Sequence, residues 1–318
     1  MKKMSVFDIN EGNKYYLRNP IITRLSTTYD CIYFGSYPQT DVTGKSADPI
    51  KWRVLAVNGD YAFLIADQIL DMKKYNMTSG DVIWENCTLR SWLNGYNGKY
   101  NICNFDYASD NFLNQAFTSK EQVAIPAIDD DEITVLTTDY KPDKVFLLSF
   151  CEASHVPFGF SSDYAYDPCR VREATKYAAF KAESHKSDTE FWWLRSKGID
   201  FGHAKGVVKG GEISTIGTYT NSTYHAVCPA LWLDLRSDCW WYAGTTTIEK
   251  DNNSNISCSA DNQSISSEQY IKVDSIKEPL IIEVEDYTEE EFAAYKKLFG
   301  CPDNVTRIKV NYSQIEYM

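Results

Sequence analysis

The sequence predicts an α+β protein in which short helices are mixed with twisted antiparallel strands. Runs of β-branched and aromatic residues separated by Gly, Pro and Asn predict strands. Apolar residues at i, i+3 and i+4 in other segments predict short helices. Asn58-Gly59 between two apolar runs predicts a β-hairpin. At roughly 150 residues per domain, the 318 residues form about two domains, or one large domain with appendages.

Strands and short helices alternate in the first half of the chain. The strand at Asp30 to Tyr37 ends near Gly35 and Pro38, which interrupt regular pairing. Thr118 and Glu121 have the spacing of a capping box, which predicts a helix start. The remaining predicted elements are the hairpin strands 50–57 and 61–66, the helices 88–93, 111–117, 118–124 and 171–182, and the buried strand 145–149.

The third quarter of the chain is rich in predicted strands. Residues 191–196 form one strand before a turn at Gly198, and a Gly210-Gly211 turn joins the strands 205–208 and 212–214. The last strand of this set covers residues 227–235. Pro229 lies inside it and lacks the amide proton that a central strand needs, so it predicts an edge position or a strand start.

Composition divides the chain into four parts. Residues 1–28 are predicted to be an irregular leader, 29–244 the main domain, 245–270 a polar linker and 271–318 a small βαβ unit. The linker is rich in Ser, Asn and Thr. The βαβ unit is predicted from two apolar runs around a helix that begins with a capping box and ends at a glycine.

Charge disfavours several classes of partner. The net charge of −12 comes from 44 acidic and 32 basic residues. Nucleic acids and anionic membranes are poorly matched, because binding them requires a basic surface. No apolar run approaches the ~20 residues that span a bilayer, so membrane insertion is not expected. The N-terminus lacks the apolar core of a signal peptide, which favours a cytoplasmic location and leaves an extracellular one open.

The residues that usually perform catalysis or bind metal follow no recognisable motif. The nine cysteines are widely spaced without a C-x-x-C pair, which is typical of buried thiols in a reducing compartment. No two of the four histidines have the spacing of metal ligands on one helix face. We therefore expect no catalytic residue, no metal site and no cofactor.

Aromatic residues give the candidate binding surface. Trp192-Trp193 and Trp240-Trp241 are adjacent pairs, and neighbouring strand residues point to opposite faces, so one member of each pair is expected to point outward. An outward tryptophan beside an arginine can stack on a ligand ring. The following loop 218–225 is polar and aromatic, which is typical of recognition surfaces. The candidate ligand-binding residues are Trp193, Arg195, Tyr219, Asn221, Tyr224 and His225. The alternative is that the tryptophans belong to the core and that the loop is an ordinary turn.

Six segments in a fixed order carry a family resemblance. They are Ile32-Tyr33-Phe34-Gly35-Ser36-Tyr37-Pro38-Gln39, Ile50-Lys51-Trp52-Arg53-Val54-Leu55, the stretch from Trp84 to Asn94, Lys144-Val145-Phe146-Leu147-Leu148-Ser149, Trp192-Trp193-Leu194-Arg195-Ser196 and Pro229-Ala230-Leu231-Trp232-Leu233. Together these segments resemble a bacterial family of uncharacterised domains over roughly residues 30 to 236. This resemblance implies no established activity.

The end of the same domain resembles the C-type-lectin fold, which includes formylglycine-generating enzymes and variable ligand-binding proteins. In those proteins a Trp-rich strand, a Gly-containing turn and an Arg-Pro-Ala-like strand close the domain. The resemblance implies a C-type-lectin-like main domain. Two positions depart from the pattern: Cys228 replaces the arginine before Pro229, and Lys197 replaces the proline after Arg195-Ser196.

Three functions follow as hypotheses. The first is a non-catalytic module that binds an unknown small molecule, glycan or protein. The second, implied by the resemblance, is an enzyme related to formylglycine-generating proteins that uses cysteine-based oxidative chemistry. The third is a structural scaffold in a larger assembly. The enzyme predicts two cysteines, or a Cys and a His, close together in a pocket, whereas the scaffold predicts a broad apolar patch.

Overall fold

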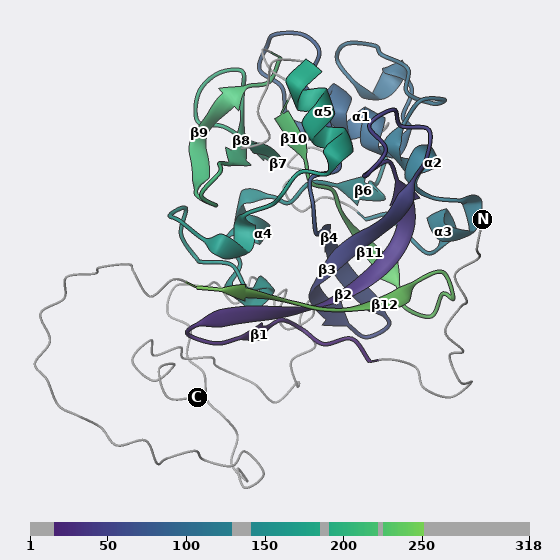
Figure 1. Cartoon of the computed structure of the whole chain (residues 1–318). Coiled ribbons are helices and arrows are strands. Elements are labelled where there is room, and N and C mark those ends of the chain that lie inside the picture. The colour runs from purple at the N-terminus through teal and green to yellow at the C-terminus, as the bar shows by residue number, and fades with distance from the viewer. Residues whose placement is uncertain (1–15, 129–140, 185–190, 222–224, 251–318) are drawn as a thin grey trace, which may run out of the picture. The chain divides into compact units, whose positions relative to one another are not determined.

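The computed structural model describes residues 16–128, 141–184, 191–221 and 225–250 (Figure 1). The chain divides into two compact units, residues 1–252 and 253–318. All described residues belong to the first unit. The βαβ unit predicted at 271–318 lies outside the described residues, as does most of the predicted linker.

A seven-stranded antiparallel sheet forms one half of the described domain. Its strand order is β1-β2-β3-β4-β11-β6, and β12 pairs with β2 off this path. The predicted hairpin is confirmed, because β3 and β4 pair on either side of the Asn58-Gly59 turn with Asn58 opposite Tyr61. The strands are β1 (Ile21–Ile22), β2 (Ser26–Tyr37), β3 (Asp48–Asn58), β4 (Tyr61–Ala66), β6 (Val145–Phe146), β11 (Ala230–Asp234) and β12 (Trp241–Glu249).

A five-stranded sheet forms the other half, with the order β5-β10-β7-β8-β9. Its pairs are antiparallel except for β10 and β7, which run parallel. The central position of β7 matters for the candidate site, because both of its edges are paired. The strands are β5 (Asp71–Lys73), β7 (Trp192–Lys197), β8 (His203–Val207), β9 (Ile213–Tyr219) and β10 (His225–Val227).

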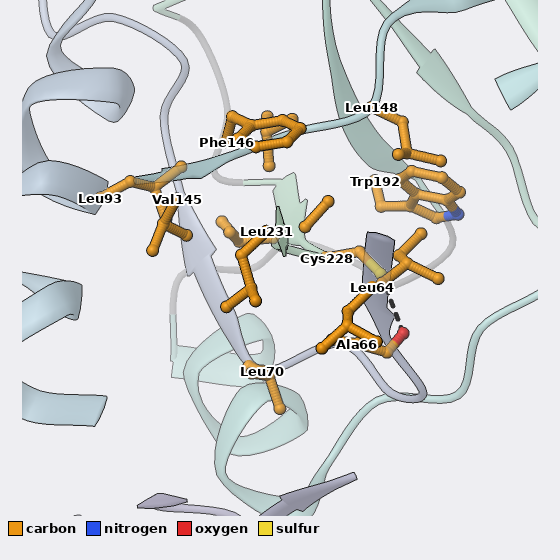
Figure 2. Packing of buried hydrophobic residues seen from close by; sticks show 14 of the residues in the cluster. Leu64, Ala66, Leu70, Leu93, Val145, Phe146, Leu148, Trp192, Cys228 and Leu231 are labelled. Carbon is orange, nitrogen blue, oxygen red and sulfur yellow. Dashed lines mark hydrogen bonds between the residues drawn. The ribbon is translucent and has the colours of Figure 1, made fainter. Parts of the chain in front are cut away.

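Two chain segments, residues 61–73 and 225–234, pair with each other across both sheets. β4 pairs with β11 in the larger sheet and β5 with β10 in the smaller one. Between these pairs, the Ala66 amide donates to the Pro229 carbonyl at 2.9 Å and the Leu70 amide to the Val227 carbonyl at 3.1 Å. In Figure 2, the Cys228 thiol donates to the Ala66 carbonyl amid this apolar packing. We call these two segments the spanning pair.

The spanning pair explains how Pro229 is accommodated. The single strand predicted at 227–235 is two strands, β10 and β11, which belong to different sheets. Pro229 lies between them, so the prediction of a strand start is confirmed. The alternative of an edge position is wrong, because β11 lies between β4 and β6.

The helices are short and mostly match the predicted positions. Thr118 and Glu121 form the predicted capping box, with the Thr118 amide donating to Glu121 Oε2 at 2.8 Å. The predicted helix 171–182 begins later, at Lys176, because Ile69 pairs with residues 173–175 and holds them extended. The helices are α1 (Thr88–Asn94), α2 (Phe112–Ala116), α3 (Ser119–Val123), α4 (Phe150–Ala153) and α5 (Lys176–Ser184), with 3-10 turns η1 (Trp84–Asn86), η2 (Gly98–Tyr100), η3 (Val156–Phe158) and η4 (Pro168–Arg170).

Two strands extend into segments that composition predicts to be irregular. β12 continues to Glu249 and pairs with β2, so residues 245–249 of the predicted linker belong to the sheet. β1 and the start of β2 lie within the predicted leader. Polar side chains on one face of a strand are compatible with pairing, because the backbone supplies the hydrogen bonds. The predicted strand 145–149 is shorter and comprises only β6.

Aromatic rings from β2, β3 and the α2 region pack in the core of the larger sheet. Phe117 packs against Phe34 and Trp52, with ring centroids 5.1 and 6.3 Å away. The Trp52 indole nitrogen donates to the Phe34 carbonyl at 2.8 Å. Gly35 has a φ of 67°, and a Cβ there would lie 2.5 Å from the Phe117 ring, so only glycine fits. The α+β class is confirmed. In the described part of the chain, no helix combines the length and apolarity that a membrane crossing needs.

A buried ion pair connects α1 to the segment that directly precedes β6. Arg90 and Asp143 are almost completely buried, and Arg90 Nε lies 2.8 Å from Asp143 Oδ1. The Trp84 indole donates to Asp143 Oδ2 at 2.9 Å and the Tyr96 hydroxyl to Oδ1 at 3.1 Å. Burial raises the pKa of Asp143, although Arg90 opposes the shift. A charge this deeply buried depends on its partner.

Replacing Arg90 is expected to destabilise the domain strongly. Arg90→Met leaves the Asp143 carboxylate buried without its cation, so urea unfolding should show a loss of about 3–5 kcal/mol. The double variant Arg90→Met/Asp143→Asn should recover part of that loss, because no buried charge remains. As a control, Lys120→Met removes an exposed ion pair with Asp238 and should leave stability unchanged. Equal losses in the single and double variants would contradict this account.

The N-cap of α1 makes a second prediction. Burial raises the pKa of the Cys87 thiol to about 12. Above pH 9 the unfolded thiol ionises while the folded thiol keeps its proton, so stability falls as pH rises towards 12. One such group contributes up to about 1.4 kcal/mol per pH unit. Cys87→Ser keeps a side-chain cap but does not ionise, and it should reduce this slope in urea unfolding between pH 9 and 11.

The matched control for Cys87 is Cys151→Ser, which changes an exposed thiol. Its alkaline slope should equal that of the wild-type protein. If Cys87→Ser also kept the wild-type slope, the Cys87 thiol would not be the source of the alkaline destabilisation.

Candidate functional site

Both tryptophans of the first adjacent pair lie in the core. Trp192 is 2% exposed and Trp193 is fully buried. The Trp193 indole donates to the Lys73 carbonyl at 2.9 Å, and the Trp192 indole to the Arg170 carbonyl at 3.3 Å. The expectation that one of the two points outward is wrong, because both faces of the central strand β7 are covered. In this structure Trp193 has no surface on which a ligand ring can stack.

Arg195 also points into the protein. Its guanidinium pairs with Glu152 of α4 and donates to the Leu147 carbonyl at 2.9 Å. The guanidinium carbon lies 5.6 Å from the centre of the Phe146 ring. The Arg195 carbonyl accepts the Tyr75 hydroxyl at 2.7 Å. These contacts fix the chain between β6 and α4 against β7, which is a structural role.

The three other predicted residues that the structure describes do not form one surface with these two. His225 is half-buried, and its ring lies 4.8 Å from that of Trp193. Tyr219 is 58% exposed and packs on His203, with ring centroids 4.1 Å apart. Asn221 is half-buried just beyond β9. Tyr224 lies outside the described residues. The structure therefore separates a buried group around Trp193 from an exposed group around Tyr219.

Large apolar side chains gather near Tyr219. Ile199 and Phe201, in the turn between β7 and β8, are 71% and 73% exposed. Ile216 of β9 is 57% exposed. We call Ile199, Phe201, His203, Ile216 and Tyr219 the β8–β9 surface. Groups of exposed apolar side chains mark interaction sites more often than single exposed residues do.

Backbone hydrogen bonds hold the turn against β9. The Ile199 amide donates to the Thr215 carbonyl at 3.2 Å, and the Thr220 amide donates to the Gly202 carbonyl at 2.9 Å. The Gly198 amide closes the turn by donating to the His203 carbonyl at 2.8 Å. The turn and β9 thus form one local scaffold next to β8 (Figure 1). The exposed side chains are therefore attached to fixed backbone positions.

β9 lies at the edge of the five-stranded sheet, and its edge is irregular. The register with β8 shifts between Ala204 and Gly206, so several residues of β9 bulge from the ladder. Gly217 within the bulge has a φ of 81°. Bulges of this kind discourage another strand from adding to the edge. Recognition at this edge therefore depends on side chains.

Sequence reasoning missed Ile199, Phe201 and Ile216. It identified the neighbouring Tyr219 through the polar-aromatic loop. The available signal was the presence of two large apolar residues, Ile199 and Phe201, inside a turn that also contains Gly198 and Gly202. Turn residues are usually exposed, so apolar side chains at such positions indicate an apolar surface patch.

Apart from the β8–β9 surface, a group of charged side chains lies between β5 and α5. Asp71 is 1% exposed, accepts the Tyr37 hydroxyl at 2.6 Å and pairs with Lys181. Lys73 places its ammonium 4.4 Å from the centre of the Trp92 ring. Burial lowers the pKa of Lys73. The ion pair between Lys181 of α5 and Asp71 of β5 connects this helix to the smaller sheet.

The described cysteines are free thiols. Burial raises the pKa of Cys31, Cys169 and Cys228, which disfavours the reactive thiolate. Within residues 16–250, leaving aside the gaps in the described ranges, no three His, Cys, Asp or Glu side chains are grouped to hold a metal ion.

Comparison with known proteins places the chain in a family. Residues 59–235 match the family model described as Domain of unknown function (DUF6273). The match runs from the β3–β4 turn to the end of β11 and includes the whole β8–β9 surface. No curated protein and no solved structure matches the chain. Because the match covers more than half of the sequence, the chain belongs to the DUF6273 family of uncharacterised domains.

Proposed function

We propose that this protein is a non-catalytic interaction module whose β8–β9 surface binds an apolar segment of another protein. The observation that carries the proposal is the exposure of Ile199, Phe201, Ile216 and Tyr219 on one turn and its adjoining strand. These four side chains keep more than half of their surface in contact with solvent, and burying them against a partner would be favourable.

The chemistry of the surface favours a protein segment over a glycan. Sugar sites combine an aromatic ring with several convergent polar groups that bind hydroxyls. Here the Tyr219 ring is accompanied by two isoleucines and a phenylalanine. The nearby charged pair, Lys197 and Asp81, is already satisfied internally. Apolar and aromatic side chains of a partner would complement this surface better than hydroxyl groups would.

We also propose that the described domain is C-type-lectin-like. The support is the order of its closing elements: the Trp-containing strand β7, the Gly-containing turn at 198–202 and the strand β11 directly after Pro229. In that fold the loops and strands near the closing elements commonly carry ligand surfaces, which agrees with the position of the β8–β9 surface.

The alternative of a cysteine-based oxidative enzyme gains no support from Cys228. Its thiol is fully buried and donates to the Ala66 carbonyl, and burial raises its pKa. A nucleophilic thiol needs a lowered pKa and access to substrate. The scaffold hypothesis shares the apolar surface with our proposal and differs in requiring a permanent assembly.

The proposal predicts peptide binding that depends on Phe201 and Tyr219. The purified full chain would be screened on a peptide array rich in apolar and aromatic sequences and, in parallel, on a glycan array. We expect peptide hits, and calorimetry with a hit peptide should show at least about a tenfold rise in Kd for Phe201→Ala and for Tyr219→Ala.

The matched control is Phe180→Ala, which removes an aromatic side chain that is 50% exposed on α5. This variant should bind the peptide as the wild-type protein does. Glycan hits without peptide hits, or peptide binding unchanged in both surface variants, would show that the proposed function is wrong.

A further inference from the structure

A buried arginine in the described domain has three of its five N–H donors unpaired. Arg172 is 8% exposed. Its Nη1 donates to the Cys169 carbonyl at 2.7 Å and the Val171 carbonyl at 2.9 Å. Its Nε and Nη2 are buried and have no hydrogen-bond partner among the described residues. These two atoms form the side-on fork with which arginine binds both oxygens of an oxyanion.

Arg90 of the same domain shows that a buried arginine can be fully paired in this fold. Arg90 is buried to a similar degree, and each of its nitrogens donates to a protein oxygen: Nε to Asp143, Nη1 to the Glu85 carbonyl and Nη2 to the Lys141 carbonyl. Leaving buried donors unpaired costs free energy, so native proteins rarely do it without a bound water or ion.

Arg53 adds a second cation beside Arg172. It is 6% exposed, and its Nη1 is also buried without a partner among the described residues. The charges of both arginines act to lower the pKa of Asp67 and the pKa of Cys228. Burial lowers the pKa of Arg172, and the charge of Arg53 lowers it further. Both arginines are thus buried around the same two groups, Asp67 and Cys228.

The local charges do not balance. Asp67 pairs with Arg53 and also with Lys51, whose Nζ lies 3.3 Å from Asp67 Oδ2. One carboxylate thus serves two cations, and Arg172 adds a third. Uncompensated charge at this depth is strongly unfavourable. An anion between the guanidiniums would restore the balance.

The other nearby polar groups can also donate hydrogen bonds. The Tyr29 ring lies 5.7 Å from the Arg53 guanidinium carbon, and the buried Tyr29 hydroxyl has only the Cys169 thiol beside it, which is a weak partner. Cys228 offers Arg172 only a thiol, which is a weak acceptor. These neighbours thus offer the two arginines no strong acceptor besides Asp67.

We propose that the unpaired fork of Arg172, together with Arg53 Nη1, holds a small oxyanion inside the fold, between β3 and the segment that precedes α5. Phosphate, sulfate and a small carboxylate such as formate share the required chemistry: two oxygens at the fork spacing and a negative charge. The bound ion links β3 to the segment before α5 and so stabilises the domain.

The test uses the full chain and thermal unfolding. Sodium phosphate, sulfate or formate is titrated at constant ionic strength, with chloride as the balancing anion. The unfolding temperature of the wild-type protein should rise with the logarithm of the concentration of at least one oxyanion, because only the folded state binds it. The three salts distinguish a tetrahedral from a planar ligand. Arg172→Met should abolish this concentration dependence.

Two controls separate binding from general effects. Sulfate and phosphate stabilise many proteins by exclusion from their surface, and Arg172→Met would retain that non-specific part. Arg170→Met removes another buried arginine, which is paired with Asp167 and with carbonyl groups. It should lower the unfolding temperature but keep the oxyanion dependence of the wild-type protein.

A measurement on the wild-type protein keeps the proposal testable if the variants do not fold. Crystals grown in chloride and soaked in sodium selenate should show an anomalous selenium peak at the Arg172 fork. The proposal is overturned if water alone occupies that position in the selenate crystals. It is equally overturned if the wild-type protein responds to the three oxyanions only as Arg172→Met does.

Discussion

The structure depends on the pairing of residues 61–73 with residues 225–234. This spanning pair contributes two strands to each sheet, through β4 with β11 and β5 with β10. At the crossing between the sheets, the amides of Ala66 and Leu70 bind the carbonyls of Pro229 and Val227. Pro229 has no amide proton to lose at this point, so the change of sheet leaves no unpaired donor there. The apolar core packs around this crossing (Figure 2).

The position of the surface follows from this arrangement. β10 belongs to the spanning pair and holds β7 in parallel, while β8 covers the other edge of β7. Trp193 and Arg195 are consequently enclosed and bind Lys73 and Glu152. The sheet then ends at β9, where Ile216 and Tyr219 remain exposed beside the turn that carries Phe201. The same layering that buries the conspicuous tryptophans leaves less conspicuous apolar residues at the surface.

The buried arginines of the domain have two different kinds of surroundings. Arg90 and Arg195 are paired with carboxylates, and each connects a helix to a neighbouring segment. Arg53 and Arg172 share the surroundings of Asp67, which is too little negative charge for both. Buried charge is stable only when it is compensated. Arg90 and Arg195 therefore hold neighbouring segments together through their carboxylate partners, whereas the bound ion that we propose would compensate Arg53 and Arg172.

Local patterns in the sequence determined the hairpin at Asn58-Gly59, the helix starting after Thr118 and the α+β class. Such features depend on residues close together in the chain, whose turn and capping chemistry acts locally. Six short segments in a fixed order indicated the family. Only the tertiary structure decided that Trp192 and Trp193 are both buried, that residues 245–249 pair with β2 and that Arg53 and Arg172 are both buried near Asp67. Those outcomes depend on which strands become neighbours, and partners distant in sequence leave no periodic signal in either segment.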